Sequence, residues 1–397
     1  MAQPLNGIRV LDLTNVLAGP FCCHQLAHMG AEVIKVEATG RGDLARQLGA
    51  DPELNKAGMG VSFLAQNAGK KSVTVNLKHP EGKAIFLRLL ATADVLVENF
   101  RPGVMKRLGL DYETLRRDHP TLIYCAISGF GQEGPWVHRP AYDQIIQGAS
   151  GVMSITGDES SAPLRVGYPV ADTVGGMTAA FAIAAALNGA PRGTFLDVSM
   201  LESVLATMGW VVSNHLIAGV TPSANGNENP TSAPSGTFAC KDGVLNIAAN
   251  KDEQWVLLTD HLGLAALRDR PEYATREDRK ANRHKLRADL ETVRMTRDPR
   301  DWAKELNRIG VPAGAVLSVP EVLKTPQVAE RGFLHHFDDV PGVGRSIDVV
   351  TTGFKVDGQA PTVVTPPPEL GQHNGEIWES LGLSAQDIET LKESGVI

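Results

Sequence analysis

Cysteine is scarce in this sequence, with four among 397 residues, at positions 22, 23, 125 and 240. The four follow no spacing that suits metal ligands, and the adjacency of Cys22 and Cys23 disfavours a mutual disulfide. A few cysteines used as small apolar residues are typical of a reducing compartment. The sequence therefore predicts no metal site and a cytoplasmic location.

A surplus of basic residues is also absent. Lys and Arg number 38 against 45 Asp and Glu, so the formal net charge is −7 at pH 7. Because neutralising nucleic-acid phosphates needs an excess of cations, this composition excludes a general nucleic-acid binder. Any anionic ligand must meet a local basic patch.

Long apolar runs and a targeting segment are missing as well. The most apolar stretch, residues 174–187, is shorter than a bilayer-spanning helix needs, so we expect no membrane partner. The opening Met-Ala-Gln-Pro-Leu-Asn lacks the basic and apolar regions of a signal peptide. With 43% hydrophobic and 21% charged residues, the chain is typical of a soluble globular protein with room for two domains.

What the sequence does contain, in its N-terminal half, is an alternation of short apolar runs with amphipathic segments. Strands are predicted over 7–13, 31–37, 72–75, 94–98 and 122–126, and helices over 21–29, 80–92 and 112–117. Such alternation predicts an α/β fold with a Rossmann-like, doubly wound parallel sheet.

The first strand–helix turn lacks the glycine fingerprint of dinucleotide enzymes. The chain offers Val-Leu-Ala-Gly-Pro at 16–20 instead of G-x-G-x-x-G, so a pyrophosphate would lose its close backbone approach. Glu37, at the end of the second strand, would suit a ribose hydroxyl, but without the glycines we disfavour an NAD or FAD enzyme. Gly19-Pro20 is better explained as a tight turn with proline in the first helical turn.

The pattern changes after about residue 215. A polar, turn-rich stretch at 221–236 is typical of a linker or mobile loop, and a second domain is expected to follow it. We expect a strand at 244–248 and charged helices from 252 to about 307, with Trp255 and Trp302 as core anchors.

Asp172 is a lone acid where an apolar run gives way to Gly175-Gly176 and a helix of small residues through Leu187. A helix N-terminus would hold its carboxylate ionised and direct it outward, as a nucleophile requires. The alternative is that Asp172 serves only as the N-cap of this helix. The local pattern leaves both interpretations open.

Basic residues gather at two predicted strand ends: Lys70 and Lys71 with Lys78, and Arg101 with Lys106 and Arg107. They are either solvated charges or partners of a phosphorylated ligand, which in open α/β sheets binds beyond the carboxyl ends of strands. Phe100 beside the second group suits contact with a base or a pantetheine arm.

An ordered set of motifs resembles the class III CoA-transferases, the CaiB/BaiF type. The segments are LDLT at 11–14, AGP at 18–20, GAEVIKVE at 30–37, KKSV at 70–73, VENFRPG at 97–103, SGFGQ at 128–132, GP at 134–135, GYPVADTVGG at 167–176, GVPAG at 310–314 and LGQH at 370–373. Each is a weak signal alone, whereas the set in order over nearly the whole chain is strong.

The resemblance implies an architecture. Residues 1–200 would form a large Rossmann-like, CoA-binding domain completed by the C-terminal segment 330–397. Residues 201–225 would be a linker, and 226–329 a smaller α+β domain. Two subunits would form a homodimer of interlocked rings. The family's mobile glycine loop would lie in the turn-rich region, where this chain has only Gly226 and Gly236.

The resemblance also implies site residues. Asp172 would be the nucleophile, with Tyr142 and Asp143 in its pocket. CoA would contact seven residues: Val16, Ala18, Val75, Lys78, Asn99, Phe100 and Arg107. The chain departs from the family pattern at Asn15 and Ala38, where His and a basic residue are expected, so Arg41 or Arg46 would supply the phosphate partner.

The activity implied is CoA transfer from an acyl-CoA donor, succinyl-CoA above all, to a short carboxylic acid through an aspartyl anhydride and an aspartyl-CoA thioester. No permanently bound cofactor is needed. The most similar members use dicarboxylic acids, whose distal carboxylate would meet a bidentate arginine, with Arg46, Arg139 and Arg165 as candidates. Leu48, where oxalate enzymes of the family carry Trp, disfavours oxalate.

Two other functions stay open on the sequence. The related α-methylacyl-CoA racemases need a second acid/base group and carry His where this chain has Tyr142, whose ordinary pKa near 10 suits proton transfer poorly. His138, nearby in sequence, is the residue that would favour a racemase. A non-catalytic CoA-binding protein is the third hypothesis, which Asp172 disfavours.

Overall fold

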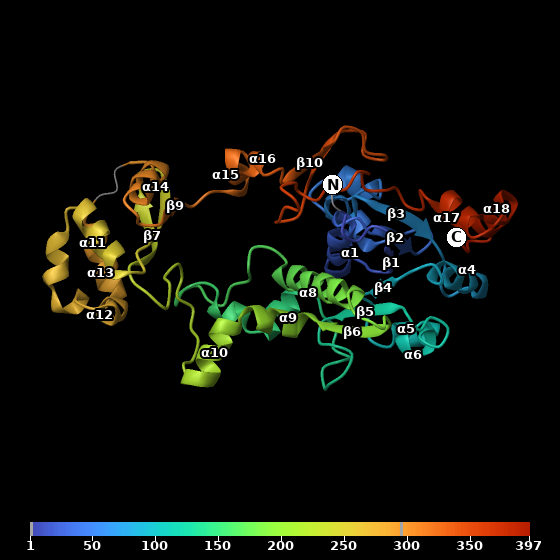
Figure 1. Cartoon of the computed structure of the whole chain (residues 1–397), viewed down its shortest axis with the longest axis horizontal. Helices are drawn as coiled ribbons and strands as arrows, with labels where there is room; N and C mark the ends of the chain where they lie inside the picture. Colours follow the sequence, from blue (N-terminus) through green and yellow to red (C-terminus); the bar gives the residue numbers. More distant parts are fainter. Residues whose placement is uncertain (1–2, 294–296) are drawn as a thin grey trace. The chain divides into compact units, whose positions relative to one another are not determined.

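The computed structural model describes residues 3–293 and 297–397, which form two compact units (Figure 1). The large unit comprises the chain up to Val152, Arg165–Val220 and Pro326–Ile397. The small unit comprises Met153–Leu164 and Thr221–Thr325. The predicted charged helices of 252–307 cross 294–296, which lie outside the described residues.

A six-stranded parallel sheet forms the centre of the large unit. Its strands are β1 Arg9–Asp12, β2 Glu32–Glu37, β3 Lys70–Thr74, β4 Val95–Glu98, β5 Ile123–Ser128 and β6 Thr194–Ser199. Their spatial order is β3-β2-β1-β4-β5-β6, with Leu11 in register with both Ile34 and Leu96. The order reverses between β1 and β4, which opens a crevice at their carboxyl ends. The predicted Rossmann-like α/β sheet is confirmed.

Helices cover both faces of this sheet because the strands are apolar on both sides. The helices of the large unit are α1 Ala18–His28, α2 Pro52–Lys56, α3 Val61–Asn67, α4 Pro80–Leu90, α5 Val104–Leu108, α6 Tyr112–Leu115, α7 Asp143–Ala149, α8 Val170–Leu187, α9 Met200–Thr207, α10 Gly209–Ala218, α16 Pro326–Glu330, α17 Asn374–Ser380 and α18 Ala385–Glu393, of which α10, α16 and α18 have no buried residues. Val10 and Val33 belong to the core that includes α1 and α8, whereas Leu11 and Ile34 belong to the core that includes α4 and α17.

The C-terminal segment covers the edge strand β3. The Ser72 amide donates to Nδ1 of His373 (3.1 Å), and the Thr74 amide donates to Oδ1 of Asn374 (2.8 Å). Trp378 of α17 is fully buried in the core on that face. An edge that would otherwise expose unpaired amides is thus capped by residues 300 positions later.

The prediction of a linker at 201–225 is wrong for most of that range. Helices α9 and α10 occupy it as far as Ala218, and both belong to the large unit. The small unit begins at Thr221 and ends at Thr325, and it also takes up Met153–Leu164, so its boundaries differ from 226–329. The turn-rich stretch that marks the boundary begins only at Thr221, after α10 has ended at Ala218.

The small unit pairs an antiparallel sheet, ordered β7-β8-β9, with several helices. Its strands are β7 Ser235–Cys240, β8 Gly243–Ala248 and β9 Ala313–Ala315, and its helices are α11 Asp252–His261, α12 Arg276–Ala281, α13 Arg283–Glu291, α14 Pro299–Arg308 and α15 Val319–Leu323. Trp255 and Trp302 are buried in its core, as predicted. The small unit also has the 3₁₀ turns η3 Ala265–Asp269 and η4 Pro271–Tyr273. The large unit has a short hairpin, β10 Leu334–Phe337 with β11 Ile347–Val350, and the 3₁₀ turn η1 Leu44–Gln47. The turn η2 Val152–Ile155 begins at the last residue of the large unit's first segment.

Helix α8 is longer than the predicted apolar stretch. Its 18 residues are enough, by length and composition alone, to cross a membrane, so the expectation that this stretch is too short is wrong. In the fold it packs against α1 and α9. A Cβ on Gly176 would lie 2.4 Å from the carbonyl oxygen of Ala18, and one on Gly175 would lie 2.9 Å from Cγ of Met200. The glycine pair therefore permits close helix packing.

Candidate active site

The crevice at the carboxyl ends of the strands contains a cavity of about 750 Å³, within the size range of small-molecule sites. Residues that follow β1, β2, β3 and β4 line it, and four of the seven predicted CoA contacts are among them: Val75, Lys78, Phe100 and Arg107. Lys78 and Arg107 bring positive charge to a cavity that also has the aromatic face of Phe100. These are the groups that a phosphorylated, base-containing ligand requires.

The other three predicted contacts are not among the residues that line this cavity. Asn99 donates from Nδ2 to the Asn15 carbonyl (2.8 Å) and accepts from the Asn15 amide (2.8 Å), so it joins the turns after β1 and β4. Val16 belongs to the same β1–α1 turn, and Ala18 is buried as the first residue of α1. They shape the cavity wall through Asn15.

The lysines at the start of β3 are structural. Lys70 is buried and its ammonium lies 2.8 Å from Asp12, while Lys71 pairs with Glu32 and Glu376. The two are therefore not available to a phosphorylated ligand.

Arg101 and Lys106 line a second cavity of about 470 Å³, together with Glu98 and His138. Burial and then the charge of Asp197 raise the pKa of Glu98 to about 8, against the opposing hydrogen bond from the Phe100 amide. This second cavity was not predicted from the sequence.

Asp172 is half-buried in the first turn of α8, whose N-cap is Pro169, so its interpretation as the N-cap is wrong. The cap is supplied by Asp143, the first residue of α7. Its Oδ1 accepts hydrogen bonds from the amides of Ala171 (2.8 Å) and Asp172 (3.4 Å). The sequence could not show this, because the two acids are 29 residues apart.

Gln147 holds Asp143 in place. This buried side chain donates from Nε2 to Oδ2 of Asp143 (2.7 Å), and its Oε1 accepts from the Val166 amide (2.8 Å). Sequence reasoning missed Gln147. The available signal was a polar residue four positions after Asp143, on the same helix face.

The environment of Asp172 disfavours its charged form. Burial, and then repulsion from Asp143, raise the pKa of Asp172 to about 7. The expectation that the helix terminus keeps this carboxylate fully ionised is therefore wrong for the free protein. A carboxylate with a pKa near neutrality is typical of functional sites and is a stronger nucleophile when ionised.

This pKa predicts a pH-dependent reaction. With Asp172 in the nucleophile role that the motif resemblance implies, only its carboxylate form would attack, so kcat/KM should fall as the pH drops through about 7. Asp143→Asn removes the repelling charge, so the pKa of Asp172 should fall and the acid limb should move to lower pH. The measurement is the pH profile of kcat/KM for both proteins. An unchanged limb in the variant would contradict the assignment of that limb to Asp172.

The other residues predicted for the site lie in different surroundings. Tyr142 is 65% exposed immediately before α7, and Arg165 lies 3.6 Å from Oδ2 of Asp143. Arg139 is exposed and stacks over Trp136, 4.4 Å from the ring centroid.

Arg46 does not fit the role of a substrate-carboxylate or phosphate ligand. It is buried, and its guanidinium forms a bidentate pair with Glu37 (2.8 and 2.7 Å). Arg41 is exposed and lines a cavity of about 770 Å³ that also includes Gln47 and Lys56.

Helix packing connects Asp172 with the cavity. Asp172 and Gly176 are one turn apart and share a face of α8, and Gly176 contacts the Ala18 carbonyl at the start of α1. The β1–α1 turn that begins this helix also lines the cavity through Leu13 and Asn15. The acid thus lies on the face of α8 that meets the end of the crevice wall.

Comparison with known proteins identifies the chain as an enzyme that transfers coenzyme A. More particularly, it belongs to CoA-transferase family III, whose sequence profile matches residues 5–374. The resemblance noted from the motifs is confirmed.

Relatives are similar over nearly their full length. The chain is 38% identical to a succinate–glutarate CoA-transferase of Agrobacterium fabrum, covering 95% of this chain and 96% of that protein. It is 40% identical to an acetyl-CoA:oxalate CoA-transferase of Acetobacter aceti, covering 83% and 85%. A crystal structure of a CaiB/BaiF family protein from Brucella suis matches with a TM-score of 0.82 at 34% identity, covering 96% of this chain and all of that one.

Proposed function

We propose that this CoA-transferase moves CoA from succinyl-CoA to a short dicarboxylic acid, with Asp172 as the nucleophile. The observation that carries the proposal is the position of Asp172, a carboxylate of raised pKa on the face of α8 that contacts the start of α1 beside the crevice. The names of relatives, including the succinate–glutarate enzyme and a succinyl-CoA:mesaconate CoA-transferase of Haloarcula marismortui, support the donor and acceptor class.

The proposed chemistry has four steps. The Asp172 carboxylate attacks the thioester carbonyl and expels CoA thiolate, which leaves a mixed anhydride. The thiolate attacks the Asp172 carbonyl, releases succinate and forms an aspartyl-CoA thioester. The acceptor carboxylate attacks that thioester to give a second anhydride and CoA thiolate. The thiolate attacks the acceptor carbonyl, which yields the new acyl-CoA and restores Asp172.

Residues near Asp172 have proposed supporting roles. Asp143 and Gln147 orient the first turn of α8, and the exposed Tyr142 faces incoming substrate at the start of α7. Arg165, half exposed beside Asp143, is our choice for the distal carboxylate of the acceptor, since a bidentate arginine suits that group. Arg139 is the alternative.

We also propose that the enzyme is a cytoplasmic homodimer, with interlocked subunits as in the family. Large apolar side chains are exposed on two helices of the large unit: Phe181 of α8 is 75% exposed, and Trp210 and Ile217 of α10 are 72% and 84% exposed. Large apolar side chains left this exposed are the kind of surface that a subunit interface would cover. Acyl-CoA and free carboxylic acids are the other partners, and no resident cofactor takes part.

The alternative of an α-methylacyl-CoA racemase is not favoured. Such an enzyme needs a second acid/base group near the α-carbon. His138, the residue that would supply it, lines the second cavity with Glu98. Tyr142 stands at the position of the racemase histidine.

The test is intact-protein mass spectrometry after incubation with succinyl-CoA, followed by a panel of mono- and dicarboxylic acids. We expect a CoA-sized adduct on the wild type and none on Asp172→Asn, with CoA passing to a dicarboxylic acid. Transfer only to monocarboxylic acids would overturn the acceptor class, and transfer only to oxalate would contradict the expectation drawn from Leu48. No adduct, with solvent deuterium entering a 2-methylacyl-CoA, would favour the racemase.

A further inference from the structure

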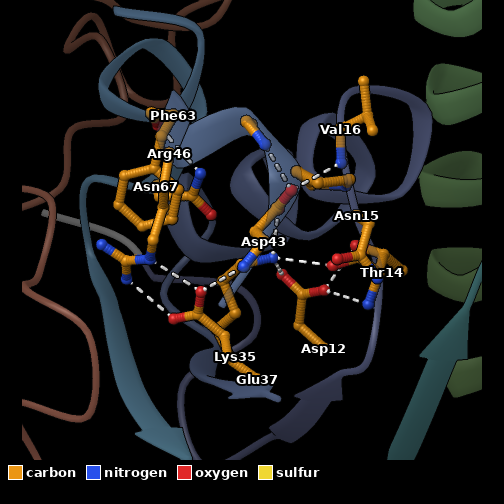
Figure 2. Close-up of polar contacts among 12 residues, drawn as sticks. Asp12, Thr14, Asn15, Val16, Lys35, Glu37, Asp43, Arg46, Phe63 and Asn67 are labelled. Atoms are coloured by element: carbon orange, nitrogen blue, oxygen red, sulfur yellow. Dashed lines mark hydrogen bonds and ion pairs between the residues drawn. The ribbon is translucent and has the colours of Figure 1, made fainter. Parts of the chain in front are cut away.

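Beneath the β1–α1 turn lies a buried network of six charged side chains, three acids and three bases (Figure 2, which labels five of them). Its members are Asp12, Lys35, Glu37, Asp43, Arg46 and Lys70, none more than 4% exposed. Lys35 lies 2.9 Å from Asp43 and 3.9 Å from Asp12. Although burial opposes it, the charges of Lys35 and Lys70 lower the pKa of Asp12 to about 2. Three acids thus face three bases within the buried network.

The network holds the backbone of the turn from below. Asp43 accepts from the Val16 amide through Oδ1 (2.9 Å), and Lys35 donates to the Thr14 carbonyl (2.8 Å). Asp12 accepts from the Thr14 amide (2.9 Å). Three buried charges therefore fix consecutive peptide groups.

The conformation held at Val16 is an unfavourable one. Its φ is +68°, the left-handed region, which a β-branched residue rarely adopts. Such a residue persists only where its surroundings over-determine it. The hydrogen bond from its amide to Asp43 is the contact made by Val16 itself among those that hold this turn.

This turn forms one wall of the crevice cavity. Leu13 and Asn15 line the cavity, and the turn continues into Ala18, whose carbonyl contacts Gly176 of the helix that carries Asp172. Relaxation at Val16 would move the wall and the start of α1 together.

We propose that Asp43 is a positioning residue for the acyl-CoA site: held by Lys35, it keeps Val16 left-handed and so sets the wall against which CoA binds. This inference rests on the proposed function. It goes beyond the proposed function by giving a binding role to an acid that lines none of the three cavities described above and lies outside the family motifs of the sequence.

A double-mutant cycle tests the positioning role of Asp43. Calorimetry measures the affinity for CoA, and enzyme kinetics measure KM and kcat for succinyl-CoA. In the wild-type background, Asp43→Asn should raise the Kd for CoA and the KM about tenfold, with a smaller change in kcat, because a charge-assisted hydrogen bond is lost. In the Val16→Gly background, Asp43→Asn should raise the Kd for CoA and the KM less than about threefold, because glycine adopts a positive φ without strain.

Controls separate the outcomes. If Asp43→Asn does not fold, Asp43→Glu replaces it in the same cycle, because glutamate keeps the buried negative charge. Asp51→Asn removes the charge of the acid that caps α2 and is not among the residues lining the crevice cavity, so it should leave affinity unchanged. Equal losses in both backgrounds would overturn the positioning role. Failure of the wild type itself to bind CoA would instead overturn the proposed function.

Discussion

Replacing Asp172 by asparagine is expected to lower kcat for CoA transfer by at least about 10³-fold, because the amide keeps the shape of the side chain but cannot attack a thioester. Affinity for CoA should change little, since the cavity lining does not include Asp172. Steady-state kinetics with succinyl-CoA, together with calorimetry for CoA, measure the two effects separately.

Two outcomes would contradict this assignment. A variant that retains more than a tenth of the wild-type kcat would show that another group carries the acyl transfer. A variant that loses CoA affinity and thermal stability in parallel would show that Asp172 supports the fold of α8. Asp172→Ala serves as the second substitution, because it removes the amide that could deamidate to aspartate.

The second large effect concerns stability. Arg46→Met should lower the free energy of unfolding by about 3 to 5 kcal/mol, because it leaves the Glu37 carboxylate buried without its guanidinium partner. Chemical denaturation of the whole chain measures the loss. Arg345→Met is the matched control: its pair with Asp51 is exposed, so its removal should cost less than about 1 kcal/mol.

The double variant Arg46→Met/Glu37→Gln identifies the cause. It removes the unpaired charge, so it should recover part of the stability lost by Arg46→Met alone. The opposite result is a double variant whose free energy of unfolding is lower than that of Arg46→Met by the full cost of a second deletion. In that case the loss comes from the packing of Arg46 over the Phe63 ring, 3.7 Å from its centroid.

The sheet could be predicted because its central strands are buried on both faces and read as continuous apolar runs. All of Ile123–Ser128 is buried, for example. Strand β6 was missed, since its edge position gives Thr194–Ser199 a mixed burial pattern without a continuous run.

The candidate site could be predicted only where one residue carried the signal. Asp172 stood out locally, Lys78, Phe100 and Arg107 follow strand ends, and Val75 was implied only by the resemblance to the family. The role of Asp143 as a cap and the pairing of Arg46 with Glu37 depend on side chains brought together by the fold. No local pattern distinguishes a buried arginine from one that awaits a substrate.

The capping of β3 by His373 and Asn374 has a consequence for synthesis of the protein. The strand is translated early, but the side chains that satisfy its amides follow 300 positions later. The whole of Thr221–Thr325 is made in between. The nascent chain therefore carries an open sheet edge through most of its translation, a period in which aggregation competes with folding and a chaperone has a surface to protect.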